Sequence, residues 1–460
     1  MAEATLSEKL AQHFISLRLE SIPEAVIHAT KLHILDSVGV LLAGSHLETG
    51  KITYDLALSF GRAGSAAEVT LPGTQGKVSL LDGVMAMASA SHCGEMDDIH
   101  GGAATCIGAM IVPALLGLGE KHGVDGRTFL EGAIGGYETT VRIGLAINGP
   151  SLFGRGWWPS TLCGVFGVAL AGATLLRWPV EKAVNALGIA GIHAGGMLTG
   201  GGEGSTARHL TFGRSAQTGV LALLATEQGL KGPTRIFEDP RGFCLTLCEN
   251  PRWDYLERLD DYFLPEVAFK PFPCARQLHA GVEALLYLLD ENRVSANEIH
   301  AIELGVPRGV AAMIDRPHIM GKRAASLASG QYIMAVTVLR GKLDLDSFGD
   351  VFLRGDGVLR LMEKVTVKAS TALDSYFPRS WPGRVRIKLI DGRSLAREVL
   401  VPKGEKENPM SANEVEQKFR TLAAPVIGEG KTRVLLEQIM KLEKLTSLDD
   451  LFSALRPGFA

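Results

Sequence analysis

The sequence predicts a mainly α fold, in which a large all-helical domain is formed by both chain ends and a smaller α/β lid domain is inserted between them. Helical periodicity runs through residues 5–265, where strand-like alternation is scarce. Alternation begins only in the segment 267–403, and helical patterning resumes after the polar stretch PKGEKENP. We therefore expect 1–266 and 404–460 to form the helical domain and 267–403 to form the lid.

The helices expected in the first part of the chain are apolar nearly all round. The run PEAVIHATKLHILDSVGVLLAG begins near Pro23, and similar runs occupy 79–92, 107–121, 127–147, 161–175, 180–193 and 213–229. Their Gly and Ala content is typical of helices packed on several sides. The most apolar run, before Glu120, is interrupted by Thr105 and Pro113 and is shorter than a membrane span, so we expect a buried core helix or helix pair and no membrane association.

The lid is predicted from a change of periodicity after FKPFPCARQLH. A helical run, HAGVEALLYLLDEN, leads to HAIELGV, whose apolar residues alternate, and helical AASLASGQYIMAVTVLRG precedes the strand-like EKVTVKAS. RVRIKLI and SLAREVLV flank Asp391-Gly392, a dipeptide typical of a tight hairpin turn. Ser411 and Glu414 then predict a capping box where the C-terminal helices begin.

Charge and cysteine content exclude several classes of partner. The chain has 47 Lys and Arg against 50 Asp and Glu, so it carries no electrostatic footprint for nucleic acid or an anionic membrane. Its 6 cysteines include no C-x-x-C pair, which favours a reducing compartment and argues against zinc. The N-terminus lacks the pattern of a secretory signal. We expect a cytoplasmic protein whose partners are small molecules or a second copy of itself.

One acidic cluster stands out among the apolar helices. The stretch SHCGEMDDIH places Glu95, Asp97, Asp98 and His100 within six positions. Adjacent carboxylates close to a histidine perturb one another's pKa values, and such groups can serve in proton transfer. Helix capping in a solvated turn is the alternative, but so many ionisable groups between apolar helices favour a functional site.

Two further segments could contribute to a site. The Gly-rich run 194–215 could form an anion nest beside Arg208, His209 and Arg214, or could be only a mobile surface loop. It lacks the Gly-Lys-Ser/Thr ending of a P-loop, so a nucleotide site is not expected. The run FKPFPCARQLH places Lys270 and Arg276 at the proposed domain junction, where clefts commonly form.

Aromatic residues supply the last candidate. GRGWWPST contains Trp157 and Trp158 beside Arg155, and these rings could line a pocket, although buried core tryptophans are more common.

Taken in order, these segments resemble the MmgE/PrpD family, which includes 2-methylcitrate dehydratase, iminodisuccinate epimerase and cis-aconitate decarboxylase. The matching segments are HCGEMDDIH against a pattern like H-x-x-D-x-D-D-T, then GYETTVRIGLA, GWWPST, ARHLTFGRSAQTGVLALLA, FKPFPCARQLH, GQYIMAVTVLRG and NPMS. The resemblance implies a helical domain built from both chain ends, an α/β lid, an active site at their interface, a homodimer, and neither cofactor nor metal.

The chain departs from this family pattern at five positions. Glu95 replaces the first Asp of the motif, Ile99 replaces its Thr, and Thr105 stands where a His is expected several residues later. Trp158 replaces a His before Pro, and Arg208 replaces the Lys of a Thr-Lys-Arg-Leu-His stretch. A dehydratase needs an acid for the departing hydroxyl, and two histidine candidates are missing, whereas epimerisation has no leaving group.

The sequence therefore favours a cofactor-independent epimerase of a small polycarboxylate, with iminodisuccinate as the precedent that best suits the departures. A dehydratase or decarboxylase of a methylcitrate-like or aconitate-like acid is the alternative, and a non-catalytic dimeric binding protein is a third possibility. We expect Asp97, Asp98, Arg208 and Lys270 to converge on one cleft. The candidate catalytic residues are Asp97, Asp98, His100 and Lys270, and the candidate substrate-binding residues are Glu95, Thr105, Trp158, Arg208, His209 and Arg276.

Overall fold

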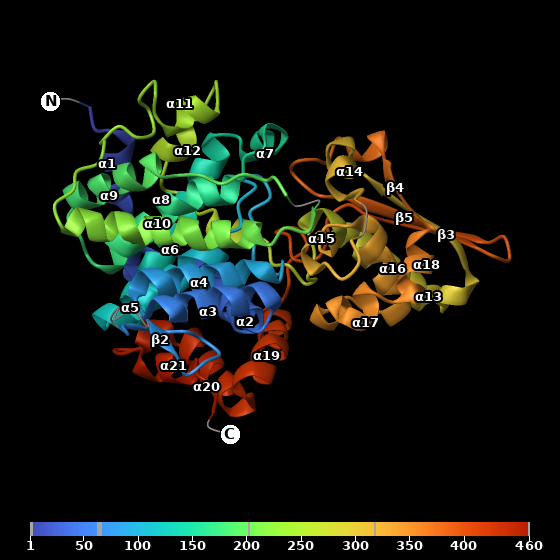
Figure 1. Cartoon of the computed structure of the whole chain (residues 1–460). Helices are drawn as coiled ribbons and strands as arrows, with labels where there is room; N and C mark the ends of the chain where they lie inside the picture. Colours follow the sequence, from blue (N-terminus) through green and yellow to red (C-terminus); the bar gives the residue numbers. More distant parts are fainter. Residues whose placement is uncertain (1–2, 62–66, 201–202, 317–318, 459–460) are drawn as a thin grey trace.

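The computed structural model describes residues 3–61, 67–200, 203–316 and 319–458. It is mainly helical, and the described residues contain one sheet of two short strands and one of four strands. Figure 1 shows a large helical body that contains both chain ends and a smaller α/β body made from the yellow and orange part of the chain. The mainly α fold expected from the sequence is confirmed.

The helical body is built around one hydrophobic core. That core includes buried side chains from residues 6–268 and again from residues 419–455. Its longer helices are α1 (Leu6–Ile15), α2 (Glu24–Ser45), α3 (Glu48–Gly61), α4 (Leu80–Cys93), α5 (Gly108–His122), α6 (Gly126–Ala146), α8 (Pro159–Leu175), α9 (Val180–Ile192), α10 (Ala207–Glu227), α19 (Ala412–Ile427) and α20 (Glu429–Met440). Helix α19 packs along α2, so the end of the chain completes the fold begun by its start.

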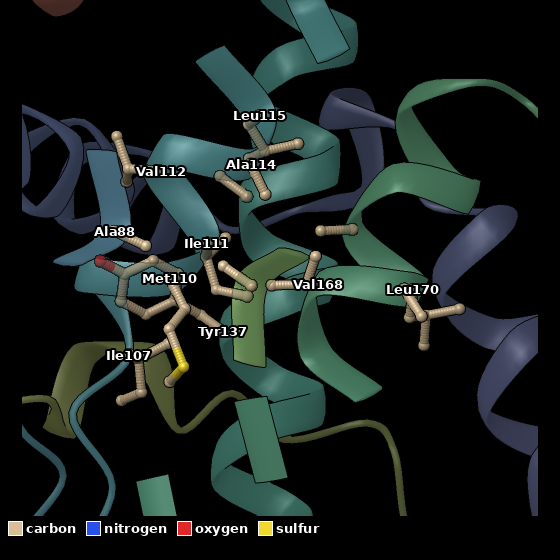
Figure 2. Close-up of a cluster of buried hydrophobic side chains, with 14 of the residues drawn as sticks. Ala88, Ile107, Met110, Ile111, Val112, Ala114, Leu115, Tyr137, Val168 and Leu170 are labelled. Carbon is tan, nitrogen blue, oxygen red and sulfur yellow. The ribbon is translucent and has the colours of Figure 1, made fainter. Parts of the chain in front are cut away.

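Helices α5, α6 and α8 form the centre of this core. Figure 2 shows Met110 and Ile111 of α5 in one cluster with Tyr137 of α6 and Val168 of α8. Helix α5 is buried from Gly108 to Gly119 and contains Pro113, as expected of a core helix. Among the described residues, only α2 is long and apolar enough to cross a membrane, and 72% of its most apolar window is buried inside the protein.

Helix α10 begins at Ala207, earlier than the predicted residue 213, and it packs against α4 and α8. The close approach depends on Gly213, because a Cβ there would lie 2.2 Å from Ser89 Oγ and 2.3 Å from the Met85 carbonyl oxygen. The earlier start matters because it places Arg208 and His209 on the first turn of a packed helix. They are therefore held by the helix and do not belong to a loop.

The lid has its own core, formed by buried side chains between residues 274 and 389. Its sheet has the order β4 (Val365–Ala369), β3 (Ile299–Val306), β5 (Gly383–Leu389), β6 (Ser394–Val399), and only β3 and β4 are parallel. Helices α13 (His279–Asn292) and α16 (Gly330–Arg340) pack on it, with α14 (Arg308–Ile314), α15 (Arg323–Ser326), α17 (Asp350–Leu353) and α18 (Asp356–Met362) around them. The predicted hairpin forms, with Gly392 at φ +92°.

One predicted lid helix is divided. The run AASLASGQYIMAVTVLRG forms α15 and α16, because the Ser329 hydroxyl accepts a hydrogen bond from the Tyr332 amide and begins a new helix. At the other end of the lid, the capping box of Ser411 and Glu414 begins α19 as expected.

Two chain segments connect the helical body to the lid, and they lie side by side. The Phe269 amide donates to the Gly404 carbonyl at 3.2 Å, and the Arg276 guanidinium binds the Glu405 carboxylate, with Nε at 3.0 Å from Oε1. Gly404 has φ +97°, and a Cβ there would lie 2.1 Å from the Phe269 carbonyl oxygen, so glycine is needed at this crossing. Pairing with the second connection holds the first connection, which contains Lys270, against the helical body.

Candidate active site

A cavity of about 110 Å³ lies between the helical body and the lid. Its wall from the helical body includes His92, Glu95, Cys106, Trp158, Ser160 and Arg208. The connecting segment contributes Lys270, and the lid contributes Arg276, Gln277, Met313, Arg316 and Trp381. Four of these side chains are cationic, and Glu95 is the acidic one, so the cavity suits a small molecule with several negative charges.

The acidic turn of the sequence forms one side of this cavity. Helix α4 ends at Cys93, and Glu95 follows with φ +53°, a left-handed conformation that is uncommon for a residue with a side chain. His92, in the last turn of α4, is 1% exposed, and its ring stacks on Phe212 with the centroids 3.6 Å apart. Its Nδ1 lies 2.9 Å from Asp97 Oδ2.

The protonation state of His92 follows from this environment. An ionised carboxylate can only accept hydrogen bonds, so His92 Nδ1 carries the ring proton and donates a hydrogen bond to Asp97. Nε2 of the neutral ring then keeps a free lone pair. Burial lowers the pKa of His92 to about 4, although the Asp97 carboxylate opposes the effect. His92 Nε2 is buried without a hydrogen-bond partner among the described residues, and it lies 3.8 Å from Glu95 Oε1. At neutral pH this nitrogen is a proton acceptor facing the cavity wall.

Lys270 lies against the same carboxylate and is 1% exposed. The backbone of Ile99 pairs with that of Ala268, which brings the connecting segment alongside the acidic turn. Lys270 Nζ therefore lies 3.4 Å from Asp97 Oδ1 and 3.4 Å from Glu95 Oε2. Burial alone would lower the pKa of Lys270, but the Asp97 charge raises it above its ordinary value. Lys270 is thus a buried ammonium group and a proton donor.

Asp97 holds both of these groups, one on each carboxylate oxygen. Burial alone would raise its pKa, but His92, which is protonated in the acidic range where Asp97 titrates, and the Lys270 ammonium outweigh burial and hold the pKa of Asp97 well below its usual range. Asp97 is 2% exposed and lies behind the groups that line the cavity. Its position fits orientation of an acid and a base better than direct contact with a substrate.

Arg208 completes the cationic wall from the helical body. Its guanidinium forms an ion pair with Glu95 and lies over the Trp158 ring, 5.2 Å from the centroid. Burial, assisted by the charge of Arg316, lowers the pKa of Arg208 to about 10, so it stays charged at neutral pH. Glu95 therefore binds both Arg208 and Lys270 and fixes the two cations on one side of the cavity.

Two protein-family models match this chain, one over most of its first half and one over most of its second half. Residues 8–256 match the model of the MmgE/PrpD N-terminal domain, and residues 272–444 match that of the MmgE/PrpD C-terminal domain. The chain belongs to the MmgE/PrpD family.

Several curated relatives carry the name cis-aconitate decarboxylase. The Aspergillus terreus protein is 26% identical over 479 residues, covering 99% of this chain and 96% of the relative. The Mus musculus protein is 24% identical (96% and 91% coverage), and the Homo sapiens protein is 23% identical (98% and 95% coverage). The names support the decarboxylase or dehydratase alternative better than the epimerase that the sequence favours.

Asp98 has a structural position in this MmgE/PrpD chain and does not face the cavity. It accepts hydrogen bonds from the Tyr137 hydroxyl at 2.7 Å and the Gly108 amide at 2.8 Å, and His33 Nδ1 lies 2.9 Å away. Adjacent residues of the extended turn point to opposite sides, so Asp97 faces Lys270 while Asp98 faces the body's core. The predicted convergence of Asp97, Arg208 and Lys270 is observed, and that of Asp98 is not.

His100 is also separated from the Asp97 cluster. Its Nδ1 accepts from the Ala103 amide at 3.0 Å, and its Nε2 lies 3.8 Å from Glu266. His100 and Thr105 pair through their backbones in the turn, and neither lines the cavity. The Thr105 side chain is fully buried. A turn of four residues, 101–104, lies between the two and returns the chain to α5, and it points both side chains away from the cavity.

The remaining predicted residues divide between the cavity and its surroundings. Trp158 and Arg276 line the cavity. His209 lies next to it, in a separate small pocket with Arg323, where its Nδ1 is 3.1 Å from the Thr49 hydroxyl. Arg214 lies on an exposed side of α10 and lines a different hollow. Two glycines at the centre of the proposed anion nest, residues 201 and 202, lie outside the described residues.

Sequence reasoning missed His92, Cys106, Arg316 and Trp381 as cavity residues. His92 had a signal, because it opens the HCGEMDDIH motif and matches the first position of the MmgE/PrpD pattern. Cys106 resembled any other buried thiol. Arg316 and Trp381 belong to a lid whose position over the acidic turn cannot be read from local spacing.

Three potential ligand atoms raise the question of a metal. Donor atoms of His92, Asp97 and Cys106 all lie within 4.8 Å of one another. Lys270 Nζ, however, is 3.4 Å from Asp97 and 3.9 Å from Cys106 Sγ, and burial raises the pKa of this thiol far above its usual value. A cation of the protein already neutralises this donor set, so it does not fit a resident metal ion.

Proposed function

We propose that the protein is a cofactor-independent lyase of a small polycarboxylate, and that its reaction is the decarboxylation of an aconitate-like tricarboxylate. The cavity supports a polycarboxylate because Arg208, Lys270, Arg276 and Arg316 all line it. Guanidinium groups bind carboxylates through paired hydrogen bonds, which gives both affinity and orientation. The cis-aconitate decarboxylase name of the relatives supports this reaction over others in the family.

One observation carries the proposal: Asp97 holds a protonated Lys270 and a neutral His92 on its two oxygens. The pair thus presents a proton donor and a proton acceptor to one small cavity at neutral pH. A proton transferred by a positioned group contributes about 10² to 10⁴-fold in rate, and fixed cations stabilise the developing charge.

Decarboxylation needs only the donor of this pair. The C–C bond to one carboxylate breaks, CO₂ leaves, and the electron pair of that bond forms a new double bond. The former double bond takes one proton at the carbon beside another carboxylate, and Lys270 supplies that proton. Solvent then returns a proton to Lys270, which balances the reaction.

Dehydration of a hydroxylated acid would use both the proton donor, Lys270, and the proton acceptor, His92. His92 Nε2 would remove a proton beside a carboxylate, and Lys270 would protonate the departing hydroxyl. The sequence favours an epimerase because two histidine acids of the family are absent, but His92 and Lys270 supply an acceptor and a donor. That reason for preferring epimerisation therefore does not apply.

Incubation of the protein with cis-aconitate in D₂O, followed by ¹H NMR and CO₂ detection, tests the proposal. We expect CO₂ release with one deuterium placed in the product. Lys270→Met should abolish this activity, whereas Lys231→Met, which alters an exposed pair with Glu181, should leave it unchanged.

Parallel incubations with 2-methylcitrate and iminodisuccinate distinguish the alternatives. Water loss from methylcitrate without CO₂ release would assign a dehydratase. Deuterium exchange into a dicarboxylate that keeps all its heavy atoms would assign an epimerase, and binding without any turnover would assign a binding protein. Each of these results would overturn the proposed decarboxylase.

A further inference from the structure

The indole N–H of Trp381 is a buried donor without an acceptor. The residue precedes β5 in the lid and lines the cavity. It is 2% exposed, and its Nε1 has no hydrogen-bond partner among the described residues. Phe377 packs edge-on against it with the ring centroids 5.0 Å apart, which limits its rotation. A buried N–H left unpaired is costly, so a donor at a cavity wall is suited to a ligand acceptor.

The lid also supplies a cation for which the described residues provide no carboxylate partner. Lys270 and Arg208 are bound by Asp97 and Glu95, and Arg276 is bound by Glu405. Arg316 follows α14, lines the same cavity, and forms no ion pair with a carboxylate of the described part of the chain. Its charge is therefore available to an anion that enters the cavity.

Gly101 leaves space beside the Trp381 N–H. A Cβ at this position would lie 3.1 Å from Nε1, which is closer than ordinary contact. Gly101 does not have a left-handed backbone conformation. Glycine is thus not needed here for the chain to turn, and an alanine would narrow the space beside the donor without straining the backbone.

We propose that Trp381 and Arg316 form a lid-side subsite that binds a substrate carboxylate remote from the reacting carbon, so that the cavity selects tricarboxylates over dicarboxylates. This inference rests on the proposed function for the identity of the ligand. The guanidinium supplies the charge and the indole N–H supplies a directional hydrogen bond. The other carboxylates are left to Arg208 and Lys270 on the opposite wall, which sets the reacting carbon beside the proton donor.

Binding of unreactive acids tests the subsite without requiring turnover. The probes are tricarballylate, a saturated tricarboxylate, and succinate, which lacks one carboxylate arm, and the measurement is isothermal titration calorimetry. Trp381→Phe removes the N–H and keeps the ring, and we expect it to weaken tricarballylate binding about 10-fold while changing succinate binding by less than about 2-fold. Arg316→Gln should act in the same direction.

Trp253→Phe makes the same chemical change at a tryptophan that packs against the helical core outside the cavity, and it should leave both affinities unchanged. Gly101→Ala should weaken tricarballylate binding although the Trp381 N–H is still present. If Trp381→Phe does not fold, this variant provides the test of the subsite. Unchanged tricarballylate affinity in Trp381→Phe, or equal losses for both acids, would overturn the subsite.

Turnover separates this inference from the proposed function. Decarboxylation by the wild-type protein with no effect of Trp381→Phe on tricarballylate affinity would refute the subsite alone. Selective binding of tricarballylate without decarboxylation would refute the proposed reaction and retain the subsite. If the wild-type protein binds neither acid, both are refuted.

Discussion

Replacing Asp97 by Asn should slow turnover and move the alkaline limb of the pH–rate profile to lower pH. The substitution keeps the shape of the side chain and removes its charge. Asp97 Oδ1 lies 3.4 Å from Lys270 Nζ, and two unit charges at that distance interact by roughly 5 kcal/mol at an effective dielectric constant of about 20. The Asp97 charge raises the pKa of Lys270, so without it the lysine should lose its proton at lower pH.

The same substitution disturbs His92. An Asn side chain can offer its NH₂ or its oxygen to Nδ1, so the tautomer that leaves Nε2 free is no longer fixed. We expect kcat to fall by about 10² to 10⁴-fold, the range over which general acid–base groups contribute. The assay is steady-state CO₂ release from pH 5 to about 11, so that the alkaline limb of the wild-type protein also falls within the range.

Asp98→Asn is the matched control, because it makes the identical change one residue later. Asp98 accepts from Tyr137 and the Gly108 amide inside the helical body, and hydrogen bonds to a charged group contribute about 1.5–3 kcal/mol each. This variant should lose roughly 3 kcal/mol of unfolding free energy in urea while its alkaline limb stays in place. Retention of more than a tenth of wild-type kcat by Asp97→Asn, with an unmoved limb, would refute the assigned roles.

Three further results are expected. Lys270→Met should abolish turnover while the protein stays folded, and global unfolding would instead assign Lys270 a structural role. Burial lowers the pKa of His92, His209 and His279. Below about pH 6.5 these histidines therefore bind protons in the unfolded chain but stay neutral in the folded protein. The unfolding free energy should therefore fall as pH drops below about 6.5, by up to about 1.4 kcal/mol per pH unit for each histidine, and a pH-independent urea midpoint between pH 7 and 5.5 would contradict this. Because burial raises the pKa of the Cys106 thiol, Cys106→Ser should keep most activity, and iodoacetamide should not inactivate the native enzyme.

The fold could be predicted from the sequence because periodicity and caps are local. The helical runs, the Asp391-Gly392 hairpin and the Ser411 capping box all depend on residues a few positions apart. The structure differs from the prediction in the earlier start of α10 and in the division of one lid helix into α15 and α16. Packing between distant segments determines the first difference, and a local helix cap determines the second. Gly213 is tolerated inside α10 because α4 packs closely against it. Helix α15 ends at Ser326, and the Ser329 cap begins α16 within a run that looks continuous in the sequence.

The site was only partly predictable, because its geometry joins distant segments. Lys270 and the acidic turn are identified by residue type and by the family pattern, and the Ile99–Ala268 backbone pairing then brings them together. Which of two adjacent carboxylates faces the lysine depends on the direction of the turn, and that direction is set by contacts with α5 and α6. Arg316 and Trp381 enter the cavity only because the lid folds over the helical body, so sequence spacing contains no signal for them.

The two oxygens of Asp97 explain how one residue can serve an acid and a base at once. Oδ2 accepts from His92 Nδ1 at 2.9 Å, while Oδ1 faces Lys270 Nζ at 3.4 Å. Burial favours the neutral form of both partners, but the single negative charge supports a positive charge on only one of them, and the more basic group, Lys270, takes it. Because Lys270 is protonated and His92 is not, the site can donate a proton to a bound substrate without first removing one from it. That arrangement suits the proposed reaction, which consumes a proton as CO₂ departs, and it makes the charge of Asp97 the feature that keeps the proton donor and the proton acceptor distinct.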